Sequence, residues 1–239
     1  MIYGGIDGCK YGWILMKSNG EEIQFGGLFK SIDNLMAEHR DLDRILIDMP
    51  MGLSSKKMKR TVESAMKKEL GVRHSTVFNA LCREALRAKD YDEAKQINER
   101  IEGKKISIQT FFISKKIAEI DGFLKNNSSL KNKFIESHPE ICFKYLNGEI
   151  LLSKKSSQLG IEERLKILQG YYPNAINLYE EVVNNTKRKF VKRDDIVDSI
   201  CLCVVNRLSG EKKMSFIEDS LIEDEMGIKM RIGYFKMKK

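Results

Sequence analysis

The chain has 239 residues, of which 42% are hydrophobic and 32% are charged, a balance typical of globular proteins that excludes an intrinsically disordered chain. Basic residues outnumber acidic residues by 42 to 34, so the formal charge is +8. This excess favours polyanionic partners, above all nucleic acid, although a generic lysine-rich surface would give the same charge.

Cysteine usage and hydropathy indicate a cytoplasmic protein. The five cysteines are scattered, odd in number and without a zinc-ligand spacing, which favours reduced and mostly buried thiols. They are Cys9, Cys82, Cys142, Cys201 and Cys203. No signal-peptide pattern opens the chain, and the apolar run 200–205 is too short to span a membrane. We expect no membrane contact, and the oligomeric state stays open, with a homodimer among the alternatives.

The first fifty residues predict three strands, a short helix and a fourth strand. The strands are expected at 2–7, 13–17, 22–29 and 44–49. Asn19-Gly20 is a strong hairpin signal between the second and third strands. Ser31 is placed to cap the short helix, and Pro50 closes the fourth strand because proline cannot continue a central strand.

Residues 54–132 have a different, polar and helical pattern. An apolar stripe from Met58 to Leu70 predicts one helix, with Gly71 at its C-terminal end. Asp90 is placed to cap a second helix, and apolar residues between Ile108 and Ile120 predict a third. Because strand-like sequence returns afterwards, we interpret 54–132 as a helical insertion within a single domain that spans 1–239.

After the insertion, the pattern predicts a short strand and four helices. The strand is expected at 134–136, and the helices at 141–146, 162–168, 175–183 and 194–208. The last helix has a clear apolar face with a period of 3.6 residues. Residues 226–235 predict one more extended segment. The fold class predicted from these elements is therefore α/β, with a sheet flanked by helices.

Acidic residues stand where these elements end or begin. Asp7 and Asp48 close the first and fourth strands. The others are Glu136, Glu140, Asp195 and Asp198. A carboxylate among apolar neighbours costs several kcal/mol, roughly, unless a cation or hydrogen bonds compensate. Hard cations such as Mg²⁺ or Mn²⁺ prefer carboxylate oxygens, so the set predicts a metal site formed by Asp7, Asp48, Asp195 and Asp198.

Structural interpretations remain open for each of these acids. Asp7 before Gly8 is also a turn residue, and Asp48 is also placed to accept backbone N–H groups ahead of Pro50. Asp194 and Asp195 also suit the positive end of a helix dipole. The pattern alone leaves open which of Asp194, Asp195 and Asp198 faces a metal.

Two further groups have both a functional and a structural interpretation. His138 next to Pro139 is either a proton carrier or phosphate contact, or a turn histidine with ordinary hydrogen bonds. Basic residues in the insertion are either phosphate contacts or a solvated surface. They are Lys56, Lys57, Lys59, Arg60 and Arg73. The segment Gly5–Gly12 lacks the glycine spacing of dinucleotide-binding and phosphate-binding loops.

Six segments together resemble a known family. They are GIDGCKYGW at 5–13, LIDMPMGL at 46–53, LGVRHSTVF at 70–78, ESHPEICFKYLNG at 136–148, RDDIVDSI at 193–200 and DEMGIKMRIGY at 224–234. In this order they resemble the predicted nucleases filed as domain-of-unknown-function family 429. That resemblance implies a ribonuclease-H-like (RNase-H-like) fold, with a mixed sheet of three antiparallel strands followed by parallel strands. It also implies metal-facing roles for Asp7, Asp48, Asp195 and Asp198. Glu136, His138 and Glu140 would belong to the His-Pro-Glu segment of that family.

We therefore expect a metal-dependent nuclease that hydrolyses phosphodiester bonds in nucleic acid with two Mg²⁺ or Mn²⁺ ions. Seven residues are candidates for the active site: Asp7, Asp48, Asp195, Asp198, Glu136, His138 and Glu140. One alternative is a non-catalytic protein that binds nucleic acid or metal on the same fold. Another is a phosphotransferase of the actin-like kinase class, which would need a second, similar half that the chain lacks. The sequence does not distinguish DNA, RNA and nucleotide substrates.

Overall fold

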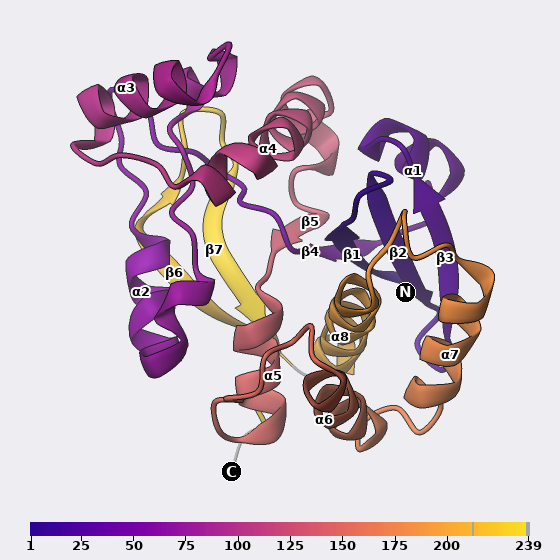
Figure 1. Ribbon diagram of the computed structural model, residues 1–239. Helices are drawn as coiled ribbons and strands as arrows, with labels where there is room; N and C mark the ends of the chain where they lie inside the picture. Colours follow the sequence, from indigo (N-terminus) through magenta and orange to yellow (C-terminus); the bar gives the residue numbers. More distant parts are fainter. Residues whose placement is uncertain (212, 238–239) are drawn as a thin grey trace. The chain divides into compact units, whose positions relative to one another are not determined.

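The computed structural model in Figure 1 describes residues 1–211 and 213–237. The chain divides into two compact units. Unit 1 consists of Met1–Asp48, Lys133–Phe216 and Gly233–Lys239, and unit 2 consists of Met49–Asn132 and Ile217–Ile232. No described helix combines the length and the apolar composition that a membrane span requires. All five cysteines are buried, and all are in the thiol form.

Unit 1 contains a mixed five-stranded sheet with the order β3-β2-β1-β4-β5. Its strands are β1 (Tyr3–Gly8), β2 (Trp13–Ser18), β3 (Ile23–Phe29), β4 (Arg44–Ile47) and β5 (Phe134–Glu136). β2 is antiparallel to both of its neighbours, β1 and β3, whereas β4 is parallel to both β1 and β5. The predicted α/β class and strand directions are therefore confirmed. The hairpin at Asn19-Gly20 joins β2 and β3 as expected.

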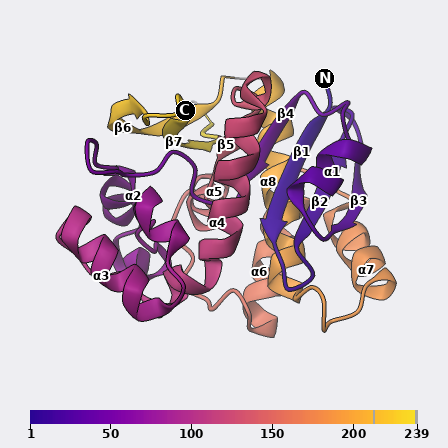
Figure 2. The ribbon, with the colours of Figure 1, turned by 90° about the horizontal axis from the view of Figure 1, so that it is seen from above.

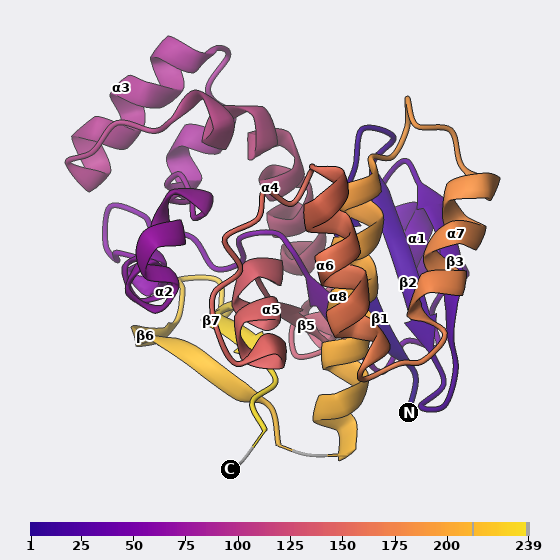
Figure 3. The same ribbon diagram turned by 60° about the horizontal axis from the view of Figure 1, so that its bottom comes forward.

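Five helices accompany this sheet in the part of unit 1 that the structure describes. They are α1 (Ile32–Glu38), α5 (Pro139–Asn147), α6 (Gln158–Gln169), α7 (Ala175–Asn185) and α8 (Arg193–Glu211). Ser31 caps α1 as predicted, with its hydroxyl accepting a hydrogen bond from Asn34 N–H. Figure 2 shows α1 and α8 on opposite faces of the sheet, and Figure 3 shows α6 beside α8. The helix α7 also contacts α8. The central strand β1 is thus covered by the last helix of the chain.

Close backbone contact fixes α8 on β1. A Cβ atom at Gly5 would lie 2.3 Å from the backbone nitrogen of Cys203 and 2.5 Å from the carbonyl oxygen of Ser199, so only glycine fits. One turn further along α8, the buried Asn206 donates its side-chain amide to the carbonyl oxygens of Gly4 (2.8 Å) and Arg44 (2.9 Å). These contacts hold α8 against both β1 and β4.

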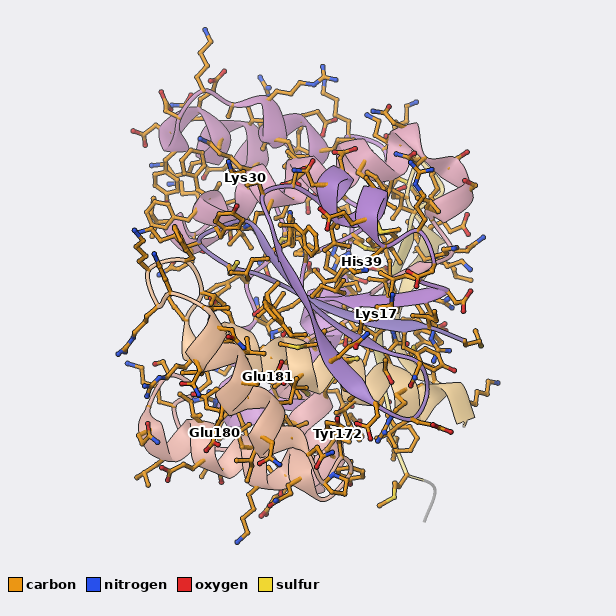
Figure 4. All side chains as sticks on the ribbon, turned by 90° about the vertical axis from the view of Figure 1, so that its right-hand side faces the viewer. Lys17, Lys30, His39, Tyr172, Glu180 and Glu181 are labelled. Carbon is orange, nitrogen blue, oxygen red and sulfur yellow. The ribbon has the colours of Figure 1, made fainter. Side chains whose placement is uncertain are left out.

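Side chains at the outer edge of the sheet attach β3 to the loop after α6. The Tyr172 hydroxyl lies 2.9 Å from a carboxylate oxygen of Glu22 and accepts a hydrogen bond from the Ile23 N–H at 3.3 Å. On β2, Lys17 pairs with Asp41 at 2.6 Å. Figure 4 views this side of the protein and labels Lys17 and Tyr172.

Unit 2 contains the helical segment predicted from the sequence together with a two-stranded sheet. Its helices are α2 (Val62–Leu70), α3 (Tyr91–Glu102), α4 (Ile108–Asn126) and the 3₁₀ turns η1 (Gly71–Thr76), η2 (Arg83–Arg87) and η3 (Ser128–Leu130). Most residues of β6 (Ser215–Glu223) and β7 (Lys229–Tyr234) belong to this unit. Asp90 caps α3 as predicted.

Buried carboxylates from the C-terminal strands hold unit 2 together. Asp219 of β6 accepts hydrogen bonds from the backbone N–H groups of Thr61 and Val62, at the start of α2. Asp224 pairs with Arg83, which also binds Asp121 at 2.8 Å. Residues 217–232 therefore supply charged partners for the helical segment.

Two local expectations differ from the structure. The helix predicted to include Met58 begins only at Val62, because Asp219 takes up the first N–H groups of α2 at that point. The single extended segment predicted at 226–235 is β7, and its partner β6 had no counterpart among the predicted strands.

Candidate metal centre

Three aspartates from distant parts of unit 1 meet at the carboxyl ends of two parallel strands. β1 and β4 run side by side with Ile6 opposite Ile47, so the next residues along each strand are Asp7 and Asp48. The Asp48 N–H donates to the carbonyl oxygen of Ile6 at 3.0 Å, which keeps the ends of β1 and β4 in register. Asp198 of α8 completes a group in which one carboxylate oxygen of each residue lies within 4.8 Å of the others.

The packing of α8 brings Asp198 to this position. Residues 5 and 7 lie on the same face of β1, because side chains alternate along a strand. Gly5 contacts Ser199 and Cys203, so Asp7 on the same face lies beside the N-terminal turns of α8. The Asp198 side chain is completely buried. The group of Asp7, Asp48 and Asp198 is called the aspartate trio below.

Lys155 supplies a positive charge to the trio. It lies in the loop between α5 and α6, and its ammonium nitrogen is 2.6 Å from Oδ2 of Asp198. The other carboxylate oxygen of Asp198, Oδ1, is buried and has no hydrogen-bond partner among the described residues. A buried carboxylate oxygen without a donor is costly, so this atom needs a cation or a donor that the protein itself does not provide.

Burial, together with nearby carboxylates, raises the pKa values of the trio members. Burial, followed by the charges of Asp48, Asp198 and Asp195, raises the pKa of Asp7 well above its usual range. Burial also raises the pKa of Asp48 and that of Asp198 to about 6, although the charge of Lys155 opposes the shift in both. Groups with these pKa values are held in the ionised form less firmly than ordinary aspartates, and a divalent cation would favour ionisation.

The trio stabilises the charged form of Lys155. Its burial lowers the pKa of the ammonium group, but the charges of Asp198, Asp7 and Asp48 outweigh that effect and raise the pKa well above its ordinary value. Lys155 is therefore charged at neutral pH and belongs to the electrostatics of the site. Sequence analysis missed it, because it stands in a polar loop with no motif around it.

Asp195 has a different position from Asp198. Its Oδ2 accepts a hydrogen bond from the backbone N–H of Lys192 at 2.9 Å, the reciprocal contact of a capping box at the start of α8. Burial raises its pKa to about 6, and its charge contributes to the raised pKa of Asp7. The sequence left open which acid of 194–198 joins the group, and the structure places Asp198 in the trio, with Asp195 at the helix start.

The remaining predicted residues lie at the end of β5 and at the start of α5. Glu136 is buried at the end of β5, paired in register with Ile47. Glu140 is buried and pairs with the equally buried Arg164 at 2.7 Å, and its charge raises the pKa of Asp48 and Asp198. His138 is half-buried at the N-terminal end of α5, directly before Pro139. Its assignment as a proton carrier stays a prediction.

One of the basic residues predicted to contact phosphate is not available to a ligand. Arg60 in unit 2 is buried, and its guanidinium pairs with Glu63 at 2.6 Å and donates to the carbonyl oxygen of Gly52 at 3.0 Å. These contacts give Arg60 a structural role, which corrects the functional interpretation. The neighbouring Lys56, Lys57 and Lys59 are exposed.

The donor set of the trio fits a hard divalent cation. Three carboxylates converge, and one of their buried oxygens has no hydrogen-bond donor among the described residues. The described group whose ligand atoms lie within 4.8 Å of one another contains no cysteine or histidine. Oxygen-only ligands at this spacing suit Mg²⁺ or Mn²⁺ better than Zn²⁺, which favours nitrogen and sulfur.

The fold and this site define an α/β protein with a buried aspartate trio at the carboxyl end of a mixed sheet. Residues 5–220 match the family described as "Protein of unknown function (DUF429)", and the chain belongs to that family. Neither the curated proteins nor the solved structures contain a significant match.

Proposed function

We propose that the protein is a metal-dependent nuclease, a hydrolase of phosphodiester bonds in nucleic acid, with an RNase-H-like unit 1. The observation that carries the proposal is the convergence of Asp7, Asp48 and Asp198 with Oδ1 of Asp198 unpaired. Three antiparallel strands followed by two parallel strands agree with the strand arrangement that the resemblance implies. The positive charge of +8 supports a polyanionic substrate.

The trio would hold Mg²⁺ or Mn²⁺ through carboxylate oxygens. A bound ion of this kind lowers the pKa of a coordinated water and neutralises charge on a phosphoryl oxygen. Lys155 holds Asp198 in place and reduces the negative charge that an approaching phosphate would meet. Arg164 holds the carboxylate of Glu140 in place, and the negative charge of Glu140 acts on Asp48 and Asp198. The two-ion form predicted from the sequence stays a prediction that metal stoichiometry tests.

The test compares Asp7→Asn and Asp198→Asn with Asp194→Asn. The first two remove a trio carboxylate and should reduce Mg²⁺-dependent cleavage of labelled DNA or RNA by roughly a hundredfold or more. Asp194 lies on the same helix, outside the trio, so its variant is the matched control and should keep wild-type activity. Cleavage by Asp7→Asn at the wild-type rate would contradict the proposal.

Metal binding measured by calorimetry separates the proposal from its alternatives. A nuclease should bind Mn²⁺ and cleave. Binding of metal and nucleic acid without turnover would favour the non-catalytic alternative, and thermal stabilisation by ATP would favour the kinase-like alternative.

A further inference from the structure

A segment with an unusually high positive charge leads into α8 and includes its first residue. Five of the seven residues 187–193 are lysine or arginine, whereas an average stretch of seven residues in this chain would hold about one. All five basic side chains are exposed. They are Lys187, Arg188, Lys189, Lys192 and Arg193. The segment contains no carboxylate, so these charges are not neutralised within it.

Contacts within unit 1 place this segment beside the aspartate trio. The Tyr11 N–H donates to the carbonyl oxygen of Phe190 at 2.9 Å, and the two rings meet edge to face with centroids 5.3 Å apart. Tyr11 belongs to the turn that follows Asp7 on β1. Near the C-terminal end of the segment, the Lys192 N–H donates to Asp195, one turn before Asp198. The segment is therefore attached, at its middle and near its C-terminal end, to elements that carry trio residues.

The same turn adds a sixth exposed cation. Lys10 lies between Asp7 and Tyr11, in a turn closed by the hydrogen bond from the Cys9 N–H to the carbonyl oxygen of Gly12 at 2.9 Å. Lys10 together with residues 187–193 is called the basic rim.

A phosphate that approaches the aspartate trio meets several negative charges, which repel it. Exposed cations next to the trio offset that repulsion and attract a polyanion over roughly a Debye length, about 8–10 Å at physiological salt. A repeating phosphate backbone also matches six exposed cations on two contacting segments better than a single small anion does.

We propose that the basic rim binds the phosphodiester backbone of nucleic acid and guides it to the aspartate trio. The identity of the partner rests on the proposed function, whereas the surface itself rests on the rim contacts. This surface lies in unit 1 and differs from the lysines of unit 2 that the sequence first indicated.

The test measures binding without cleavage. Fluorescence anisotropy of a labelled oligonucleotide, single-stranded or duplex, is recorded in EDTA for the wild type and for two triple variants. The rim variant carries Lys187→Gln, Arg188→Gln and Lys192→Gln, which spares Lys189 over the Phe190 ring and Arg193 beside Gln158. The control variant carries Lys56→Gln, Lys57→Gln and Lys59→Gln, with the same loss of three charges.

The rim variant should bind at least roughly tenfold more weakly, and its slope of log K against log salt should fall by about 2 for a single strand. The control should stay close to the wild type. Equal losses in both variants, a loss in the control alone, no binding by the wild type, or binding only to vesicles of anionic lipid would overturn the inference. Thermal melting of each variant verifies that the fold is retained.

Failure of this inference is distinguishable from failure of the proposed function. If the wild type binds through the rim but cleaves no nucleic acid with Mg²⁺ or Mn²⁺, the nuclease assignment fails and the binding surface stands. If the wild type cleaves and the rim variant binds normally, the surface is wrong and the nuclease assignment stands.

Discussion

Asp48 and Asp198 carry carboxylates whose pKa of about 6 lies above that of an ordinary aspartate, with burial as the largest cause. A carboxyl group with a raised pKa in the folded state binds more protons there than in the unfolded state. Its contribution to stability therefore falls as the pH rises between the two pKa values. A bound cation requires the ionised form and reverses this trend.

We predict that the metal-free protein loses stability between about pH 3.8 and 6 and that Mg²⁺ raises the melting temperature more at pH 7.5 than at pH 5. The difference should amount to a few degrees, since about 1 kcal/mol corresponds to roughly 2–4 °C for a chain of this size. Scanning calorimetry with EDTA or Mg²⁺ measures both trends. Asp48→Asn should flatten them, and an equal gain from Mg²⁺ at both pH values would contradict the assignment.

Lys155 both stabilises the buried carboxylate of Asp198 and competes with a metal ion for it. Replacement of Lys155 tests these two effects separately. Lys155→Met removes the partner of a fully buried carboxylate, so the metal-free protein should be less stable. The same change should tighten Mn²⁺ binding roughly tenfold, since about 1.4 kcal/mol of lost competition corresponds to that factor.

Calorimetric titration of Lys155→Met with Mn²⁺ measures this effect and also gives the number of ions bound. The exposed neighbour Lys154 provides the control, and Lys154→Met should change neither property. Weaker Mn²⁺ binding by Lys155→Met would show that Lys155 supports the cation and does not compete with it.

At the scale of elements, the contact between β1 and α8 decides whether the trio exists. Gly5 is the point of closest approach, and the neighbouring polar contact comes from Asn206. Asp7 and Asp198 are separated by 190 intervening residues, so only this packing brings their oxygens together.

Gly5→Ala should displace α8, because the added Cβ would lie 2.3 Å from the Cys203 nitrogen. We expect a loss of about 1–3 kcal/mol or more in the free energy of unfolding, together with weaker Mn²⁺ binding. Gly122→Ala in α4 meets no atom within 4 Å and should be neutral or stabilising by up to about 1 kcal/mol. Denaturant unfolding and metal titration measure both effects, and unchanged metal affinity in Gly5→Ala would contradict this account.

At the scale of the whole molecule, local signals in the sequence predicted much of unit 1. Strand lengths, the Asn19-Gly20 turn and Pro50 act over a few residues, so the strands and their order followed from the pattern. Asp7 and Asp48 were predicted to share a metal site because both are carboxylates that close a strand, and the parallel pairing of β1 and β4 places them at the same edge of the sheet.

Features that depend on distant contacts were not predictable in the same way. Lys155 stands in a loop without periodicity, and its role depends on a partner 43 residues away. The choice of Asp198 over Asp195 depends on the rotation of α8, which is fixed by Gly5 and not by the acids themselves. β6 was missed because its position depends on distant contacts. Its residue Asp219 accepts a hydrogen bond from the hydroxyl of Thr61, 158 positions earlier in the chain.

The packing of the last long helix on the first strand also has a consequence for synthesis in the cell. At about 5–20 residues per second, a ribosome needs roughly 10–40 s to proceed from β1 to the end of α8. During that time β1 cannot pack against α8, and the apolar residues near β1 stay exposed to solvent, where they favour aggregation. A chaperone that protects the emerging N-terminal hairpin would therefore increase the yield of folded protein more than one that acts after release.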